Sequence, residues 1–114
     1  ARNLYEHNPT VTLMRTTAEE NARLGEVIAQ KANAARGPVK IILPLRGISA
    51  IDAVGQPFYD PAATAALFEA IRRHTSVEIK EVDAHINDPQ FAASIVAEFM
   101  GMLHTSVRRT DALA

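Results

Sequence analysis

The stretch VKIILPLRG, residues 39–47, decides the fold class of this chain. Its residues are apolar almost without interruption from Val39 to Leu45, whereas a strand with one face in water alternates apolar and polar residues. Such a run is typical of a parallel strand that helices cover on both faces. The sequence therefore predicts a buried parallel strand here, and with it an α/β fold.

Strand and helix patterns alternate on both sides of this run. The upstream helix has a capping-box pair at Thr17 and Glu20, and the two downstream helices each begin with an Asp-Pro pair, which suits a helix N-terminus. The predicted elements are, in order, a strand over 10–15, a helix over 17–36, a strand over 39–45, a helix over 61–75, a strand over 77–86 and a helix from residue 89.

This order predicts three parallel strands joined by right-handed helical crossovers. The expected fold is a three-layer α/β fragment of the Rossmann-like or flavodoxin-like kind, in which Arg15, Arg46 and His85 meet at a common rim. Three strands make a small sheet, so we expect further strands from sequence outside this chain or from a second copy of it. Residues 47–60 form a long loop, which is more often functional or mobile than a short one.

The chain has 114 residues, of which 47% are hydrophobic, and this suits a single domain over 1–114. The last ten residues, 105–114, show no apolar stripe and are expected to form a frayed tail. Because the chain begins with Ala1, we expect it to be part of a longer protein.

The charge balance and the missing cysteines exclude several classes of protein. A formal net charge of −1 provides no field that would attract nucleic acid or an anionic membrane surface. Without cysteine there can be no disulfide, thiolate zinc site or cysteine nucleophile. No apolar run is long enough for a membrane span and no signal segment is recognisable, so a cytoplasmic location is expected.

Ligands of parallel sheets bind outside the carboxyl ends of the strands. The first such end is Arg15, Thr16 and Thr17, where a guanidinium, a hydroxyl and free helix amides could hold an anion. The alternative is that Thr17 only caps the helix and Arg15 is solvated.

The second strand end comprises Arg46, Gly47, Ser49 and Asp52, at the start of the long loop. Glycine there permits a close backbone approach to a ligand. The spacing matches neither a Walker loop nor a dinucleotide fingerprint, and an ordinary turn is the alternative.

The third strand end is VDAHINDP, residues 82–89. If the strand continues, Asp83 and His85 share a face and could act as an oriented general base, while Asn87 could bind a ligand. Asp88 is placed to cap the next helix. A structural role for this segment is the alternative, and no metal site is predicted because too few ligands are present.

The segments LMRTT, LPLRGISAID and DAHINDP resemble the C-terminal domain of the uncharacterised bacterial and plant proteins grouped with the tomato tobamovirus-resistance protein, a family described as ATP-binding. The resemblance covers about His7 to Phe91. It implies that the chain is the last part of a protein with two α/β domains, and that ATP is bound mainly in the N-terminal domain, outside this fragment. No nucleotide-binding residue of the family can be assigned to a position here.

Three functions remain open at this point. The first is a ligand-binding domain that contributes one wall of an interdomain cleft for a small molecule. The second is an enzyme domain that uses His85 and Asp83 for acid-base chemistry on a small acid or carbonyl compound. The third is an oligomerisation module. The expected partners are the missing N-terminal domain and, in all three cases, further copies of the chain.

Overall fold

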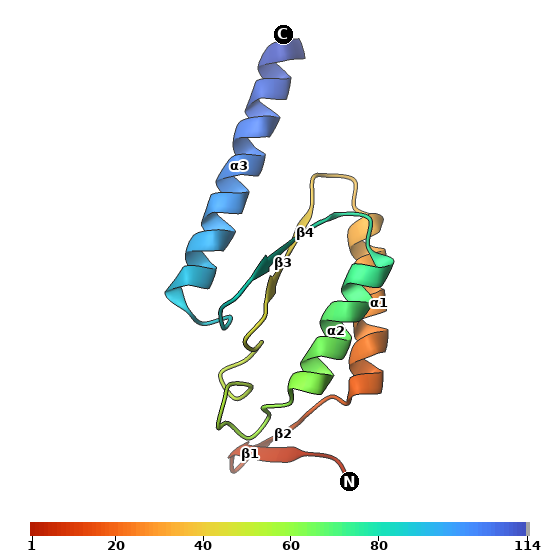
Figure 1. The fold of residues 1–114 in the computed structure, drawn as a ribbon, viewed down its shortest axis with the longest axis vertical. Helices are drawn as coiled ribbons and strands as arrows, with labels where there is room; N and C mark the ends of the chain where they lie inside the picture. Colours follow the sequence, from red (N-terminus) through yellow and green to blue (C-terminus); the bar gives the residue numbers. More distant parts are fainter. Residues whose placement is uncertain (114) are drawn as a thin grey trace.

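The computed structural model describes the backbone of residues 1–113 and the side chains of residues 1–107, and it shows an α/β chain with two small sheets and three helices (Figure 1). The elements are β1 (Leu4–Asn8), β2 (Val11–Met14), α1 (Ala18–Asn33), β3 (Lys40–Pro44), α2 (Pro61–His74), β4 (Glu78–Val82) and α3 (Pro89–Leu113).

β3 and β4 form the parallel pair that the apolar run predicts, with α2 as the connection between them. Alternate residues of β3 point to opposite faces of this sheet. Leu43 packs against Phe68 of α2, whereas Ile42 packs against the cluster that contains Phe91 of α3. Helices therefore lie against both faces of β3, as expected for a strand without a water-facing side.

The predicted third parallel strand is wrong. β2 is the strand expected over 10–15, but it pairs antiparallel with β1 in a separate hairpin. The turn residues explain the hairpin, because the Asn8 side-chain oxygen accepts hydrogen bonds from the Thr10 amide and hydroxyl, both at 2.9 Å. With only two parallel strands, the more specific Rossmann-like or flavodoxin-like fold is not confirmed.

α1 packs tightly against α2 because Gly25 has no side chain. A Cβ atom at this position would lie 2.6 Å from the Leu67 carbonyl oxygen and 2.7 Å from the Ala70 Cβ. One turn earlier, Asn21 is buried and donates to the Ala63 carbonyl at 2.8 Å. The two helices thus form one layer with a short separation.

α3 is longer than the sequence predicts. It continues to Leu113, so the frayed tail expected over 105–114 is corrected for residues 105–113, while Ala114 lies outside the described residues. No glycine or proline follows Gly101, so no residue there interrupts the helix. Lys40 of β3 forms an ion pair with Glu98 of α3, in which Nζ lies 2.7 Å from a carboxylate oxygen. Within residues 1–113, no helix has the length and apolar content of a membrane span.

The predicted capping box at the start of α1 is confirmed. The Thr17 hydroxyl accepts from the Glu20 amide at 3.2 Å, and the Glu20 carboxylate accepts from the Thr17 amide at 2.9 Å. The same carboxylate is paired with Arg2. The hydrogen bond from Arg2, and next that from Thr17, lower the pKa of Glu20 from 4.5 to about 2.

Glu20 should therefore stabilise the fold in a pH-dependent way. Because its pKa is lower in the folded than in the unfolded state, its contribution is present above pH 4.5 and is lost as the pH falls towards 2. We expect Glu20→Gln to lower the melting temperature at pH 6 and to match the parent at pH 2. Thermal unfolding followed by circular dichroism measures this difference. Glu19→Gln, which removes a carboxylate from the same turn, is the control, and an equal pH profile for both variants would contradict the assignment.

Candidate functional site

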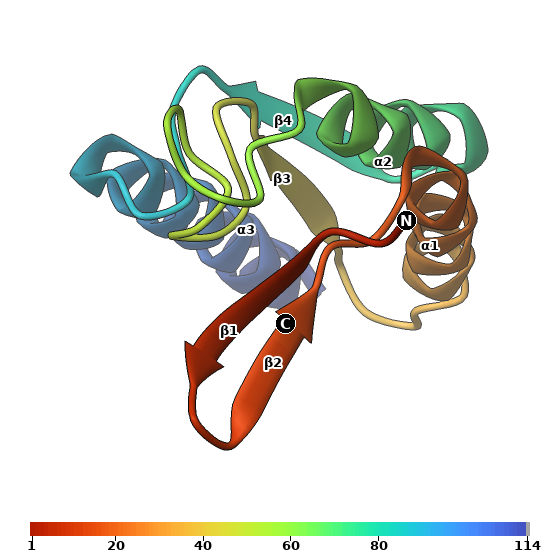
Figure 2. The same ribbon diagram turned by 90° about the horizontal axis from the view of Figure 1, so that it is seen from below.

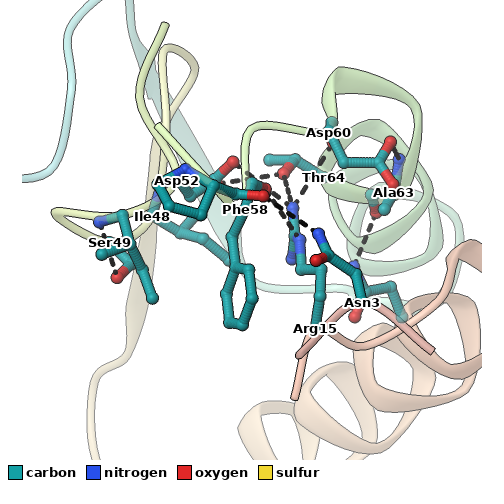
Figure 3. Close-up of polar contacts among 12 residues, drawn as sticks. Asn3, Arg15, Ile48, Ser49, Asp52, Phe58, Asp60, Ala63 and Thr64 are labelled. Atoms are coloured by element: carbon teal, nitrogen blue, oxygen red, sulfur yellow. Dashed lines mark hydrogen bonds and ion pairs between the residues drawn. The ribbon is translucent and has the colours of Figure 1, made fainter. Parts of the chain in front are cut away.

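The loop between β3 and α2 folds over a buried arginine (Figure 3). Arg15 is 7% exposed and Asp52 is 3% exposed. The Arg15 guanidinium donates to the Thr64 hydroxyl at 2.8 Å, to the Phe58 carbonyl at 3.1 Å and to the Asp60 carbonyl at 3.4 Å, and one of its nitrogens lies 3.4 Å from an Asp52 carboxylate oxygen. The partners of the guanidinium are therefore groups of the protein itself.

Arg15, Thr16 and Thr17 therefore do not form the anion site considered from the sequence. Arg15 points into the loop, where its Nε and Nη2 atoms donate to other groups of the protein, and Thr17 caps α1. Thr16 lies between them and is half-buried. The alternative prediction that Thr17 only caps the helix fits the structure, whereas the prediction of a solvated Arg15 does not.

Asp52 ties the long loop to itself and to α2. Its second carboxylate oxygen accepts from the Ile48 amide and from the Thr64 hydroxyl, both at 3.2 Å. Its amide donates to the Ser49 carbonyl at 2.9 Å. A loop held by buried polar bonds of this kind presents its lining residues in one arrangement.

Gly47 lies where β3, the long loop and the segment after β4 meet. Its φ is +140°, and a Cβ atom there would lie 2.1 Å from the Asp52 carbonyl oxygen and 2.6 Å from the His85 ring. Its carbonyl accepts from the Ile86 amide at 3.0 Å. Only glycine satisfies both the backbone angle and the space.

His85 is held by the backbone on both sides of its ring. Nε2 lies 2.8 Å from the Ser49 carbonyl, which can only accept, so this nitrogen carries the proton. Nδ1 accepts from the Asn87 amide at 3.1 Å. The His85 amide in turn donates to the Asp88 carboxylate at 2.9 Å. The ring thus fastens the segment after β4 to the long loop.

Asp83 does not orient His85. β4 ends at Val82, so the alternation that would place the two side chains on one face does not extend to them. Asp83 instead accepts two hydrogen bonds from Arg46, at 2.8 and 3.0 Å, and both side chains are exposed. The hydrogen bond from Arg46 lowers the pKa of Asp83, and the one to Asp83 raises the pKa of Arg46.

A pocket of about 490 Å³ lies between the end of β3, the long loop and α2. Three of the predicted site residues line it: Arg46, Gly47 and Asp52. Its other polar lining side chains are Tyr59, Thr64 and Arg72, and its apolar wall includes Leu45, Val54, Pro61, Ala65 and Phe68. Ser49, Asp83, His85 and Asn87 do not line the pocket. Asp83 bonds to Arg46 and His85 bonds to Ser49 of the long loop, whereas the Asn87 amide bonds to His85.

The α2 residues of the pocket are missing from the sequence prediction. Thr64, Phe68 and Arg72 are spaced by four and therefore share one side of the helix. A hydroxyl, an aromatic ring and a guanidinium on one helix side are the signal that could have identified this wall. Among residues 1–107, no cluster of three or more histidine, aspartate or glutamate side chains could hold a metal ion.

The fold and the pocket define a small α/β domain with a concave site at the carboxyl end of a parallel strand. Residues 1–103 match the model of the uncharacterised protein family UPF0261, C-terminal domain, and the chain belongs to this family. The resemblance stated from the sequence is thereby confirmed.

Relatives of this chain occur in bacteria and in a plant. It is 51% identical over 102 residues to a UPF0261 protein of Rhizobium meliloti (strain 1021), covering 86% of this chain and 26% of the relative. It is 44% identical over 105 residues to one of Clostridium tetani, covering 90% and 26%. It is 41% identical over 103 residues to the ToMV resistance protein Tm-1(GCR237) of Solanum lycopersicum, covering 87% and 14%. The chain thus spans about a quarter of the length of these two bacterial relatives.

Proposed function

We propose that this chain is a ligand-binding part of a larger protein of the family, and that the pocket at the end of β3 binds a small organic anion with an apolar body. The observation that carries the proposal is the presence of two guanidinium groups, Arg46 and Arg72, in a pocket that also has an apolar wall. Guanidinium groups bind carboxylates and phosphates through paired hydrogen bonds.

Both arginines are available for exchange of partners. Arg46 is paired with Asp83, and Arg72 with Glu81 and with Glu69, where the shortest Arg72–Glu69 distance is 3.6 Å. Exposed ion pairs contribute little to stability, so an anionic ligand can replace these carboxylates at small cost. The buried Asp52 carboxylate is already matched by Arg15 and does not repel such a ligand.

The apolar wall determines which kind of uncharged body the ligand can have. Leu45 directly follows β3, Phe68 of α2 is 5% exposed, and Val54 lines the pocket from the loop. Contacts of this kind favour a ligand with an aliphatic or aromatic body over a highly charged ligand such as a nucleoside triphosphate. This agrees with the implication of the resemblance that ATP is bound mainly outside this fragment.

A cleft between this chain and the rest of the polypeptide would enclose the pocket. Support comes from the length of the relatives, since this chain spans about a quarter of the two bacterial ones. Sites between domains are common for small molecules. In this proposal, Arg46 and the loop form one wall, and the part of the protein outside this chain forms the other.

The two alternative functions differ in their support. Enzymatic acid-base chemistry by His85 and Asp83 has no geometric support, because Asp83 bonds to Arg46 and both ring nitrogens of His85 are bonded to the backbone. Oligomerisation is favoured by the exposed apolar residues Val96, Phe99 and Leu103 of α3. It is compatible with ligand binding, and sedimentation of this chain at rising concentration tests it.

The anion site predicts a difference between an acid and its amide. We expect hexanoate or phenylacetate to bind this chain, and the corresponding neutral amides to bind at least about tenfold more weakly, because the amides lack the charge that the guanidinium groups recognise. Isothermal titration calorimetry measures both affinities. We expect Arg72→Ala to weaken acid binding by about tenfold as well.

The matched control is Arg36→Ala, which removes an exposed arginine outside the pocket. It should leave the affinity unchanged. Equal binding of acid and amide, or an equal loss in Arg36→Ala and Arg72→Ala, would show that the pocket does not recognise an anion.

A further inference from the structure

One edge of β3 has no strand beside it. The Leu45 amide donates to the Val82 carbonyl of the β4 strand at 3.0 Å. Because the peptide groups of successive strand residues point to opposite edges, those of Ile41 and Leu43 face β4 and those of Lys40 and Ile42 face away. Among the described strands, only β4 pairs with β3. The Ile42 amide therefore lies at an unpaired edge.

α1 lies beyond this unpaired edge. It packs against α2, and none of its side chains belongs to the two apolar clusters that join β3 and β4 to α2 and α3 in the described part of the chain. Figure 2 shows the order β4, β3 and then α1, which lies beyond β3 as seen from β4. Packed helices are about 10 Å apart and paired strands about 4.8 Å, so a layer of two helices is wider than a sheet of two strands.

The sheet-facing side of α1 is apolar and uncovered. Leu24 is 45% exposed and Ile28 is 42% exposed. Asn21 and Gly25 mark the side of the helix that contacts α2, and Ala22 and Glu26 line the groove on one flank of that contact. Helical geometry puts Leu24 and Ile28 on the other flank, towards the layer of the sheet. Their exposure shows that the described part of the chain leaves both side chains largely uncovered.

The opposite face of the sheet is also incomplete beside β3. A pocket of about 310 Å³ lies between β3 and α3, lined by Ile42, Ile95 and Phe99 among others. Ile95 is 43% exposed and Phe99 is 60% exposed. The unpaired edge of β3 is thus flanked by exposed apolar residues of α1 on one face and of α3 on the other.

We propose that the unpaired edge of β3 binds a β-strand from the remaining part of the full-length family protein, between α1 and α3. Such a strand would complete the hydrogen bonds of Lys40 and Ile42 and would cover Leu24, Ile28 and Phe99. It must be apolar on both faces, because helices cover both. The occupant follows from the length of the relatives, about three quarters of which lies outside the matched segment in the two bacterial proteins.

A second copy of this chain fits this edge poorly. A copy that paired its own β3 here about a twofold axis would bring its own α1 into the layer that α1 already occupies beyond β3. Because each copy has α1 beyond the edge of its own β3, the two α1 helices would compete for the same space. A segment that contributes a strand without an adjoining helix has no such conflict.

Hydrogen exchange at single amides tests the proposal. The probe is the part of the Rhizobium meliloti relative outside the matched 102 residues, produced as a separate polypeptide, shown by circular dichroism to be folded, and mixed with this chain. We expect the Ile42 amide to exchange rapidly in the chain alone and at least about tenfold more slowly in the mixture. The Leu43 amide, which faces β4, is the internal control and should be slow in both samples.

Three outcomes would overturn the proposal. The first is that no complex forms, and the second is that a complex forms while Ile42 exchange is unchanged. The third is that Ile42 becomes protected in the chain alone as its concentration rises, with dimers seen by sedimentation, because a second copy would then occupy the edge.

A pair of variants places the contact on α1. Ile28→Glu puts a carboxylate under the added strand and should weaken the complex by at least about tenfold. Gln30→Glu puts the same charge on the solvent side of the same helix and should leave the complex unchanged. Circular dichroism of the isolated chains checks that both variants fold. Equal effects of the two substitutions would remove α1 from the interface.

Discussion

Arg15→Ala is expected to lower the free energy of unfolding by about 3–5 kcal/mol, the cost of leaving one partner of a buried ion pair unpaired. The substitution leaves the Asp52 carboxylate, which is 3% exposed, without its counter-charge. It also removes the donor to the Phe58 and Asp60 carbonyls and to the Thr64 hydroxyl. Urea unfolding followed by circular dichroism measures the loss.

Two further variants separate the ion pair from general effects of removing an arginine. Arg23→Ala removes an exposed arginine whose distance to Glu26 is 3.9 Å, and we expect no measurable change in stability. The double variant Arg15→Ala, Asp52→Ala removes both charges, and we expect it to be less destabilised than the sum of the single variants. Strict additivity would mean that the two side chains do not act together.

Gly47→Ala is the second substitution with a large expected effect, a loss of about 3 kcal/mol in the free energy of unfolding. An alanine there must adopt a φ of +140° and must place its Cβ against the Asp52 carbonyl and the His85 ring. Both the long loop and the segment after β4 have to move to accept it. The pocket should therefore lose anion affinity together with stability.

The other glycines provide graded controls for this prediction. Gly55→Ala also requires a positive φ, of +83°, but has open space around it, so it should cost only the backbone strain, about 1–2 kcal/mol. Gly37→Ala has neither constraint and should leave stability unchanged or raise it by up to about 1 kcal/mol. If Gly47→Ala were no worse than Gly55→Ala, the close approach at Gly47 would have no energetic weight.

The parallel pair and the helices were predictable from local patterns. An unbroken apolar run predicts a strand covered on both faces, and this applies to β3. The capping box of α1 and the Asp60 cap of α2 act within four residues, so the sequence contains all their partners. Predictions of this kind require no knowledge of distant contacts.

The hairpin and the burial of Arg15 depend on contacts that sequence patterns do not contain. The strand pattern over 10–15 indicates extended backbone but does not indicate which edge it pairs with, and its partner β1 lies in a segment without a marked apolar alternation. An arginine is expected at the surface from its chemistry alone. Its partners Asp52 and Thr64 are 37 and 49 residues away, and only the folded loop brings them together.

The sequence predicted only part of the candidate site, because some of its residues are brought together only by the fold. Arg46, Gly47 and Asp52 follow the end of a recognisable strand, and this position is where ligands of parallel sheets bind. Thr64 and Arg72 lie within a helix that otherwise reads as structural. Asp83 and His85 are two residues apart in the sequence, but β4 ends before them and their side chains bond to different partners.

The bonds of Arg15 connect the N-terminal arm of the molecule to the interior of the pocket. The arginine directly follows β2, and its guanidinium reaches Thr64 and Asp52, which line the pocket. Asn3, just before β1, also donates to the Pro57 carbonyl of the loop at 3.0 Å. A displacement of residues 1–15 would therefore shift Asp52 and Thr64 in the pocket wall. In the intact protein, any contact that fixes residues 1–15 would also stabilise the shape of the pocket.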